Sequence, residues 1–223
     1  MTTDVIGILR ETGLFGSVPP DDLGVLVAVS RLRAFRRGQV VFMTGDPGDT
    51  LVVVISGRVK VVARAADGGE LTLTVVGSGG VFGELSVADG GPRSADAETL
   101  DECQLLFVPR EAVWDICSRV PPVAQALAGS LAATLRRLTE AASDLVFLDL
   151  PRRVAKVLLS QPRGGDGIIR LMVSQEELAH QAGGSRQSVN AALREFERRG
   201  WIEVHGRAVA IAQAPALGRF AGN

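Results

Sequence analysis

Residues 82 to 95 contain side chains that can hold an anion. Gly83 lets the backbone approach a ligand closely, and Glu84-Leu85-Ser86 predicts a short helical turn whose free N–H groups favour negative charge. Arg93 offers a planar guanidinium that can take two phosphate oxygens at once, and Ser94 adds a hydroxyl and a backbone N–H. The chemistry expected of this stretch is the binding of one phosphate.

Glu84 has a different expected role, because a carboxylate repels a bound phosphate. It is expected to accept a hydrogen bond from a sugar hydroxyl, as acidic residues do on ribose in dinucleotide sites. A phosphate, a sugar hydroxyl and a pocket together predict a nucleotide with a single phosphate charge. The alternative is a surface turn between two strands that contains an incidental arginine.

The order of these residues resembles the phosphate-binding cassette of cyclic-nucleotide-binding domains. The matching letters are Phe-Gly-Glu-Leu-Ser at 82–86 and, after a short loop, Pro-Arg-Ser-Ala at 92–95. The resemblance implies that Glu84 holds the ribose and that Arg93 and Ser94 hold the cyclic phosphate. Gly83, Leu85 and Ser86 complete the expected site.

Short β-rich runs surround this cassette and predict the scaffold that positions it. They cover residues 39–42, 50–55, 59–63, 70–76 and 103–108. Turn residues separate them, with a loop at 45–49 and tight hairpins at 56–57 and 67–69. The pattern predicts an antiparallel roll that carries the cassette in a loop, and the region resembles a cyclic-nucleotide-binding jelly roll.

Helical patterns flank the roll. Residues 5–14 and 21–29 predict two short helices before it, and residues 110–119 predict one after it. A long helix then begins at residues 121–122, both proline. Its apolar residues alternate at spacings of four and three, which is an a/d seam: Ala124, Ala128, Leu131, Leu135, Leu138, Ala142 and Leu145. The seam predicts pairing with the same helix of a second copy, hence a homodimer, rather than a lone amphipathic helix.

Two helices joined by a glycine turn predict a helix-turn-helix near the C-terminus. Ser174 begins a capping box before a helix over 176–182. Residues 183–184 are both glycine, and Ser185 caps a second helix over 186–199. Such pairs occur in DNA-binding domains, where the second helix reads bases, and also as plain packing motifs.

Side-chain types on the second helix favour DNA as its partner. Arg186 can bind guanine, and Gln187 and Asn190 can bind adenine. A hairpin over 201–212 follows as a wing. The predicted DNA-binding residues, those placed for phosphates included, are Ser174, Ser185, Arg186, Gln187, Ser188, Asn190, Arg194, Arg198 and Arg207.

The charge distribution agrees with this placement. Residues 1–150 hold 13 Lys and Arg against 19 Asp and Glu, a net charge of −6. Residues 151–223 hold 11 against 6, a net charge of +5. The basic C-terminal part is therefore expected to meet a polyanion, although arginines scattered over a solvated face are the plainer explanation.

Composition argues against several other classes. No apolar run is long enough to span a membrane and the N-terminus lacks the pattern of a signal peptide, so a cytoplasmic protein with no membrane partner is expected. Cys103 and Cys117 are too few for a disulfide framework or an iron–sulfur cluster and are expected to be buried. His180 and His205 have no second ligand at metal spacing and no catalytic constellation around them, so neither a metal site nor an enzyme is expected.

End to end, the chain resembles transcription regulators of the cyclic AMP receptor (Crp/Fnr) family. Residues 147–149 and 153–155, with 174–179 and 185–190, carry this resemblance alongside the cassette. It implies an α+β protein with a jelly-roll cyclic-nucleotide-binding sensor over 1–120, a dimerisation helix and hinge over 121–150, and a winged helix-turn-helix over 151–223. It also implies double-stranded DNA as partner, cyclic AMP as effector ligand rather than cofactor, and RNA polymerase as a candidate partner.

The sequence departs from the family where the base of the ligand should lie. Cyclic AMP binders typically place a threonine against adenine, whereas this chain has Leu138, followed by Thr139, at that position of the long helix. A leucine cannot hydrogen-bond the adenine edge, so the effector and its coupling stay open. Gln187 and Ala191 replace a glutamate and a basic residue of the family's reading helix, which predicts a different target sequence. Two alternatives therefore remain: a regulator that reads DNA without ligand, and a nucleotide-sensing adaptor for a protein partner.

Overall fold

The computed structural model describes residues 4–66, 69–161, 175–205 and 208–222. By its internal contacts the chain divides into two units, Met1–Ala66 with Leu73–Arg137 and Asp67–Thr72 with Leu138–Asn223. The long helix α5, Pro121–Phe147, contributes residues to both. The domain boundaries at 120 and 150 stay a prediction from the sequence.

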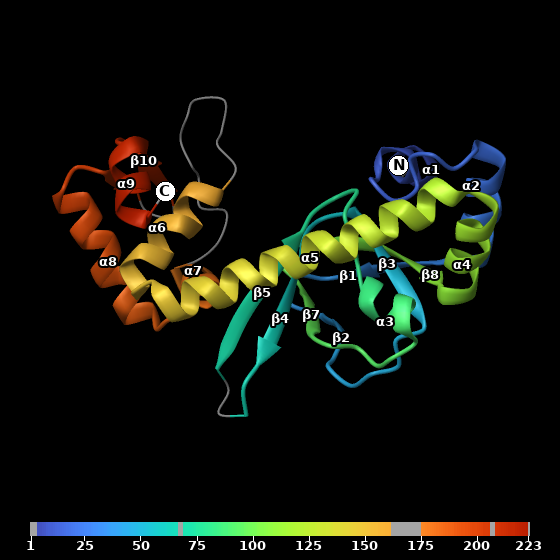
Figure 1. Ribbon diagram of the computed structural model, residues 1–223, viewed down its shortest axis with the longest axis horizontal. Coiled ribbons are helices and arrows are strands. Elements are labelled where there is room, and N and C mark those ends of the chain that lie inside the picture. The colour runs from blue at the N-terminus through green and yellow to red at the C-terminus, as the bar shows by residue number, and fades with distance from the viewer. Residues whose placement is uncertain (1–3, 67–68, 162–174, 206–207, 223) are drawn as a thin grey trace. The chain divides into compact units, whose positions relative to one another are not determined.

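The first unit contains two four-stranded sheets that form a roll (Figure 1). One sheet has the order β1-β8-β3-β6 and the other β2-β7-β4-β5. Neighbouring strands whose register is resolved run antiparallel, as a jelly roll requires. The strands are β1 Arg31–Phe35, β2 Val40–Phe42, β3 Thr50–Ser56, β4 Val59–Arg64, β5 Glu70–Val76, β6 Val81–Phe82, β7 Asp96–Thr99 and β8 Cys103–Pro109. The start of β5, up to Thr72, belongs by its contacts to the second unit.

Strand β3 is buried on both faces, which explains its unbroken apolar run. Leu51, Val53 and Ile55 pack into a cluster with the flanking helices, whereas Val52 and Val54 pack between the two sheets. Successive side chains of a strand point to opposite faces, so a strand covered on both sides must be apolar throughout. β3 is therefore the central strand from which the cassette is supported.

Helices close one end of the roll, where α1, α2, α4 and the start of α5 gather (Figure 1). These are α1 Val5–Glu11, α2 Pro20–Val29 and α4 Arg110–Arg119. Asp4 caps α1 by accepting a hydrogen bond from the backbone N–H of Gly7 at 2.8 Å. Leu9, Leu23, Ile116 and Val123 of these helices are buried against sheet residues, as is Phe15 of the turn after α1. Only the first two turns of α5 contribute buried residues to this core.

The chain path corrects one prediction and adds elements that were not predicted. Residues 56–57 do not form a hairpin, because β3 and β4 lie in different sheets. Gly57 does adopt a positive φ of 85°, as a glycine turn requires. The strand that follows it, β4, pairs with strands of the other sheet rather than with β3. Strands β1, β6 and β7 were not predicted. β1 has only one buried residue, β6 has only two residues, and β7 directly follows the cassette.

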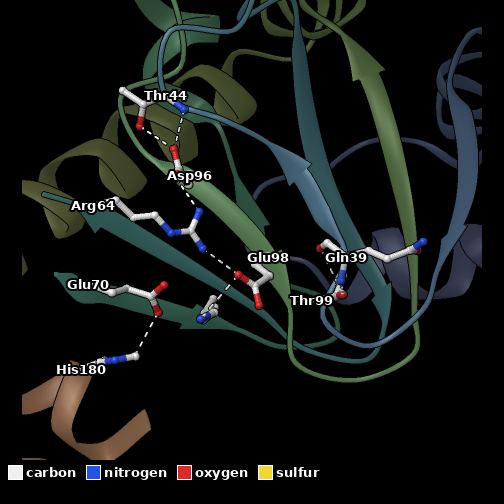
Figure 2. A network of polar contacts seen from close by, with 9 residues as sticks. Gln39, Thr44, Arg64, Glu70, Asp96, Glu98, Thr99 and His180 are labelled. Carbon is white, nitrogen blue, oxygen red and sulfur yellow. Dashed lines mark hydrogen bonds and ion pairs between the residues drawn. The ribbon is translucent and has the colours of Figure 1, made fainter. Parts of the chain in front are cut away.

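The second unit has its own apolar core. Its helices are α6 Leu150–Ser160, α7 Gln175–Ala182, α8 Arg186–Arg198 and α9 Ala214–Ala221, and β9 Ile202–His205 pairs with β10 Ala208–Ile211. Leu158, Leu178, Val189, Phe196 and Leu217 meet in this core. The sequence also predicts a short strand over residues 168–173, which lie outside the described residues. Helix α9 was not predicted. His180 contacts Glu70 at 3.1 Å within this unit (Figure 2).

A polar network ties β7 to its neighbours (Figure 2). Arg64 of β4 donates to Asp96 at 2.6 Å and to Glu98 at 2.7 Å. Asp96 also accepts from the backbone N–H and the hydroxyl of Thr44 at 2.6 and 2.8 Å. Burial alone would raise the pKa of Asp96, but these hydrogen bonds and the Arg64 charge outweigh it and lower the pKa. The network holds the strand that begins just after the cassette.

Candidate functional site

The cassette begins at a glycine that no other residue could replace without strain. Gly83 follows β6 and caps α3, Glu84–Asp89, with φ at +80°. A Cβ on Gly83 would overlap Nη1 of Arg93. The position therefore requires glycine both for its backbone angle and for the close approach of the arginine.

Arg93 lies inside the roll, with only 3% of its surface exposed. Its Nη2 donates to the Thr50 hydroxyl at 2.9 Å, and its Nη1 donates to the Gly83 carbonyl at 3.2 Å. The Phe42 ring lies beneath the guanidinium, with its centroid 4.3 Å from Cζ. The arginine is thus held by three elements: β3, the turn before α3, and β2.

One donor of this guanidinium is not used. Nε of Arg93 is buried and has no hydrogen-bond partner among the described residues. Burial lowers the pKa of Arg93, and the charges of Asp49 and Asp46 partly oppose that effect. An arginine nevertheless stays charged at neutral pH. A buried cation with an unused N–H group is the arrangement expected for binding an oxyanion, because a buried donor that makes no hydrogen bond costs free energy.

Glu84 is also withdrawn from water, with 9% of its surface exposed. The hydroxyl of Thr134, on α5, donates to its Oε1 at 3.1 Å. Sequence reasoning did not find Thr134, Thr50 or Phe42. Thr134 lies beside the leucine seam rather than in it, and no local motif joins it to a residue 50 positions away.

The other cassette residues divide between structural and exposed positions. Ser86 is buried and its hydroxyl donates to the Pro92 carbonyl at 3.1 Å, which closes the loop after α3. A Cβ on Gly48 would overlap Ser86, so the loop that contains Gly48 passes close to Ser86. Leu85 and Ser94 are exposed. Ser86 is therefore placed to shape the loop. Ser94, the residue after Arg93, is open to solvent.

Helix α4 anchors the far end of α3. The carbonyl of Val87 accepts hydrogen bonds from Nε of Arg110 at 2.8 Å and from the Trp114 indole at 3.0 Å. Both donors come from the first turns of α4. This double contact fixes α3, and with it Glu84, against the helical end of the roll.

Leu138 and Thr139 lie on α5 in the second unit, and both are exposed. Leu138 follows Thr134 by four residues, so the two lie on the same face of the helix, one turn apart. The proposed contact of Leu138 with the base of a ligand stays a prediction.

The leucine seam of α5 is largely open in the single chain. Leu135 is 67% exposed, Leu138 37% and Leu145 45%. Ala142 is also exposed and Leu131 is half-buried. Apolar side chains repeated along one helix in this way fit a helix–helix interface.

The second predicted site lies at the start of α8. Ser185 caps the helix by accepting from the backbone N–H of Ser188 at 3.2 Å, as predicted. Val189, Leu193 and Phe196 are buried, also as predicted. The exposed residues among the predicted DNA contacts are Ser185, Arg186, Gln187, Ser188, Arg194 and Arg198, whereas Asn190 is half-buried. Arg198 contacts Glu195, and Ser174 and Arg207 lie outside the described residues.

Arg153 fixes the glycine turn between α7 and α8. Its guanidinium donates to the carbonyls of Leu148, Ala182 and Gly183 at 2.7, 2.8 and 3.2 Å. Gly183 has a positive φ of 64°. Three contacts from one planar group hold the end of α5 to the glycine turn, and so position α8 within the second unit.

Within the described part of the chain, no group of three or more His, Cys, Asp or Glu side chains could hold a metal ion. Cys103 and Cys117 are buried free thiols, and burial raises the pKa of both. Over the same residues, no helix is long and apolar enough to cross a bilayer.

Comparison with known proteins matches each half of the chain to a known domain family. Residues 32–120 match the family model of the cyclic nucleotide-binding domain, and residues 152–220 match that of the Crp-like helix-turn-helix domain. The chain is 39% identical over 220 residues to a CRP-like cAMP-activated global transcriptional regulator of Mycobacterium tuberculosis, covering 96% of this chain and 98% of that protein. It is 32% identical over 213 residues to the cyclic AMP receptor protein of Thermus thermophilus, covering 96% and 98%. Among solved structures, the c-di-GMP responsive global regulator CLP of Xanthomonas campestris superposes with a TM-score of 0.76 at 28% identity, covering 86% of this chain and 99% of that one.

Proposed function

The chain belongs to the Crp/Fnr family of transcription regulators, and we propose that cyclic AMP is the effector that controls it. Its two matched domains make it a DNA-binding regulator that responds to a cyclic nucleotide. The observation that carries the choice of a phosphate ligand is the buried Arg93 guanidinium with its unused Nε. Two relatives that align over nearly their whole length bear names that refer to cyclic AMP.

In this proposal the cyclic phosphate binds Arg93, with Ser94 beside it, and the ribose hydroxyl binds Glu84. The phosphate offers the acceptor that Nε lacks, and it neutralises a buried positive charge. Glu84 directly follows Gly83, and its Oε1 is bonded to Thr134 of α5 rather than to Arg93. Adenine would meet α5 near Leu138 and Thr139, where leucine offers shape but no hydrogen bond.

The proposed active form is a homodimer. Leu131, Leu135, Leu138, Ala142 and Leu145 would pack against the same residues of a second copy, which would place two α8 helices on one duplex. Ligand would favour the DNA-binding form only by as much as it binds that form more tightly. We expect a regulator that acts on DNA to work in the cytoplasm, and RNA polymerase remains a candidate partner.

Titration calorimetry tests the ligand. We expect cyclic AMP to bind the wild type and Arg93→Ala to weaken it by about 100-fold, or about 2.7 kcal/mol. Arg36→Ala, which removes an exposed arginine of the same unit, should bind like wild type. Equal binding by Arg93→Ala, or no binding by wild type, would remove the proposal. Cyclic GMP and cyclic di-GMP in the same series would identify another effector.

A regulator that reads DNA without ligand is the second candidate, favoured by the leucine at position 138. In a gel-shift assay it would bind its operator equally well with and without cyclic AMP. Selection of bound DNA from a random pool under both conditions would give the operator, its two-fold symmetry and the ligand requirement together.

A further inference from the structure

Glu84 is held by a short chain of hydrogen bonds that begins on α5. We propose that Thr134, supported by Arg137, is a positioning residue that presents the Glu84 carboxylate to the sugar hydroxyl of the nucleotide and so sets the preference for ribose over deoxyribose. This inference rests on the function proposed above.

The contacts run in one direction. Nη2 of Arg137 donates to the Thr134 hydroxyl oxygen at 3.3 Å, and that hydroxyl donates its proton to Oε1 of Glu84 at 3.1 Å. Arg137 and Thr134 are three residues apart on one helix, which brings their side chains to the same face. A hydroxyl has one proton and two lone pairs, so it can accept from the cation and donate to the carboxylate at once.

This arrangement differs from a direct ion pair in what it leaves available. An arginine bound to a carboxylate engages both oxygens with its fork. A threonine hydroxyl supplies only one proton, so the carboxylate keeps acceptor capacity for a ligand hydroxyl. The charge of Arg137 polarises the hydroxyl and strengthens its bond to Oε1. Glu84 is 9% exposed, so few water molecules can take over this role.

The geometry also explains why the carboxylate stays in one place. Glu84 is the first residue of α3, a helix of only six residues, and its side chain reaches α5. The Thr134 hydroxyl bonds one carboxylate oxygen to α5 and so limits rotation of the Glu84 side chain.

The test compares cyclic AMP with its 2′-deoxy analogue by titration calorimetry on the full chain. We expect the wild type to bind cyclic AMP at least about tenfold more tightly than the analogue, which corresponds to about 1.4 kcal/mol. Thr134→Val should weaken cyclic AMP about tenfold and leave the analogue nearly unchanged, so the preference disappears. Thr134→Ser keeps the hydroxyl and should keep the preference.

A matched pair of arginine variants tests Arg137, the first residue in this series of hydrogen bonds. Arg137→Ala should lower the sugar preference about threefold, whereas Arg136→Ala, which removes the adjacent exposed arginine, should not change it. If Thr134→Val does not fold, this pair and Thr134→Ser still decide the question. Thermal unfolding of each variant without ligand reports whether α5 remains packed.

The outcomes separate this inference from the proposed function. Equal weakening of both nucleotides by Thr134→Val, loss of the preference in Thr134→Ser, or equal effects of the two arginine variants would mean that Thr134 only packs α5, and would overturn the inference. Binding by wild type without sugar preference would overturn it while leaving a cyclic-nucleotide effector in place. Failure of wild type to bind either nucleotide would overturn both.

Discussion

At the scale of single residues, the phosphate end of the pocket depends on what surrounds Arg93. Thr50 and Gly83 accept its two Nη donors and Phe42 lies under its plane, so the guanidinium is oriented before any ligand arrives. Orientation in advance reduces the entropy lost on binding. Residues that never touch the ligand can therefore change its affinity.

Replacement of Thr50 tests this point. We expect Thr50→Val to weaken cyclic AMP binding about tenfold and to lower the free energy of unfolding by about 1–3 kcal/mol, because a buried charged donor loses its acceptor. Calorimetry and urea unfolding measure the two effects. Thr72→Val is the matched control: the Thr72 hydroxyl is buried without a hydrogen-bond partner among the described residues, so its removal should leave stability equal or higher. Similar losses in both variants would contradict the role given to Thr50.

At the scale of elements, β7 supports the cassette through Asp96. Its pKa is lower in the folded chain than the ordinary value of about 3.9, so between these two values the unfolded chain binds more protons. The stabilisation from Asp96 is therefore complete above about pH 5 and is lost as the pH falls through the folded pKa.

Asp96→Asn should show this dependence. We expect the variant to be less stable than wild type by about 1–2 kcal/mol at pH 7, because the ion pair with Arg64 is lost. The difference should shrink as the pH is lowered below about 4, through the folded pKa of Asp96. Urea unfolding at a series of pH values measures it. A difference that does not vary with pH would show that the Asp96 charge does not contribute.

Helix α5 is the second element whose role can be measured. Burial of each seam leucine in a dimer would contribute about 1.5–3 kcal/mol. We expect Leu135→Glu to convert the protein from dimer to monomer at micromolar concentration in sedimentation velocity. Ala133→Glu changes an exposed residue of the same helix away from the seam and should remain dimeric. A monomeric wild type would rule out the seam as an interface.

At the scale of the whole molecule, the two parts of the chain carry net charges of opposite sign. The net charge of −6 over residues 1–150 repels a duplex, and that of +5 over residues 151–223 attracts it. The direct contacts with DNA are therefore expected to come from residues 151–223, and binding should weaken steeply with salt.

Salt-dependent DNA binding tests this division. We expect Arg194→Ala to weaken operator binding for all sequences and to reduce the slope of log K against log salt by about 1. Arg186→Ala should cost about 1–3 kcal/mol and relax the requirement for one base pair in each half-site, with half-sites about one helical turn apart. Fluorescence anisotropy from low to physiological salt measures both. A shallow slope for wild type would favour an adaptor that acts on a protein partner.

Local patterns in the sequence were sufficient to predict the cassette, the antiparallel roll, the extent of α4 and the capped helix α8. Each depends on neighbours within a few residues: the glycine before α3, the alternation of apolar positions, and Ser185 ahead of the apolar stripe of α8. These effects act along the chain, so the chain alone determines them.

Only the tertiary structure decided which distant residues meet. It placed β3 and β4 in different sheets, although the turn at Gly57 suggested a hairpin, because β3 pairs with β8 and β4 pairs with β7, strands that lie far along the chain. It also brought Thr50 and Phe42 to Arg93, and Thr134 to Glu84, across 43, 51 and 50 positions. Hydrogen bonds and ring contacts of this kind leave no periodic trace in a sequence, since they depend on two elements packing at one distance and angle.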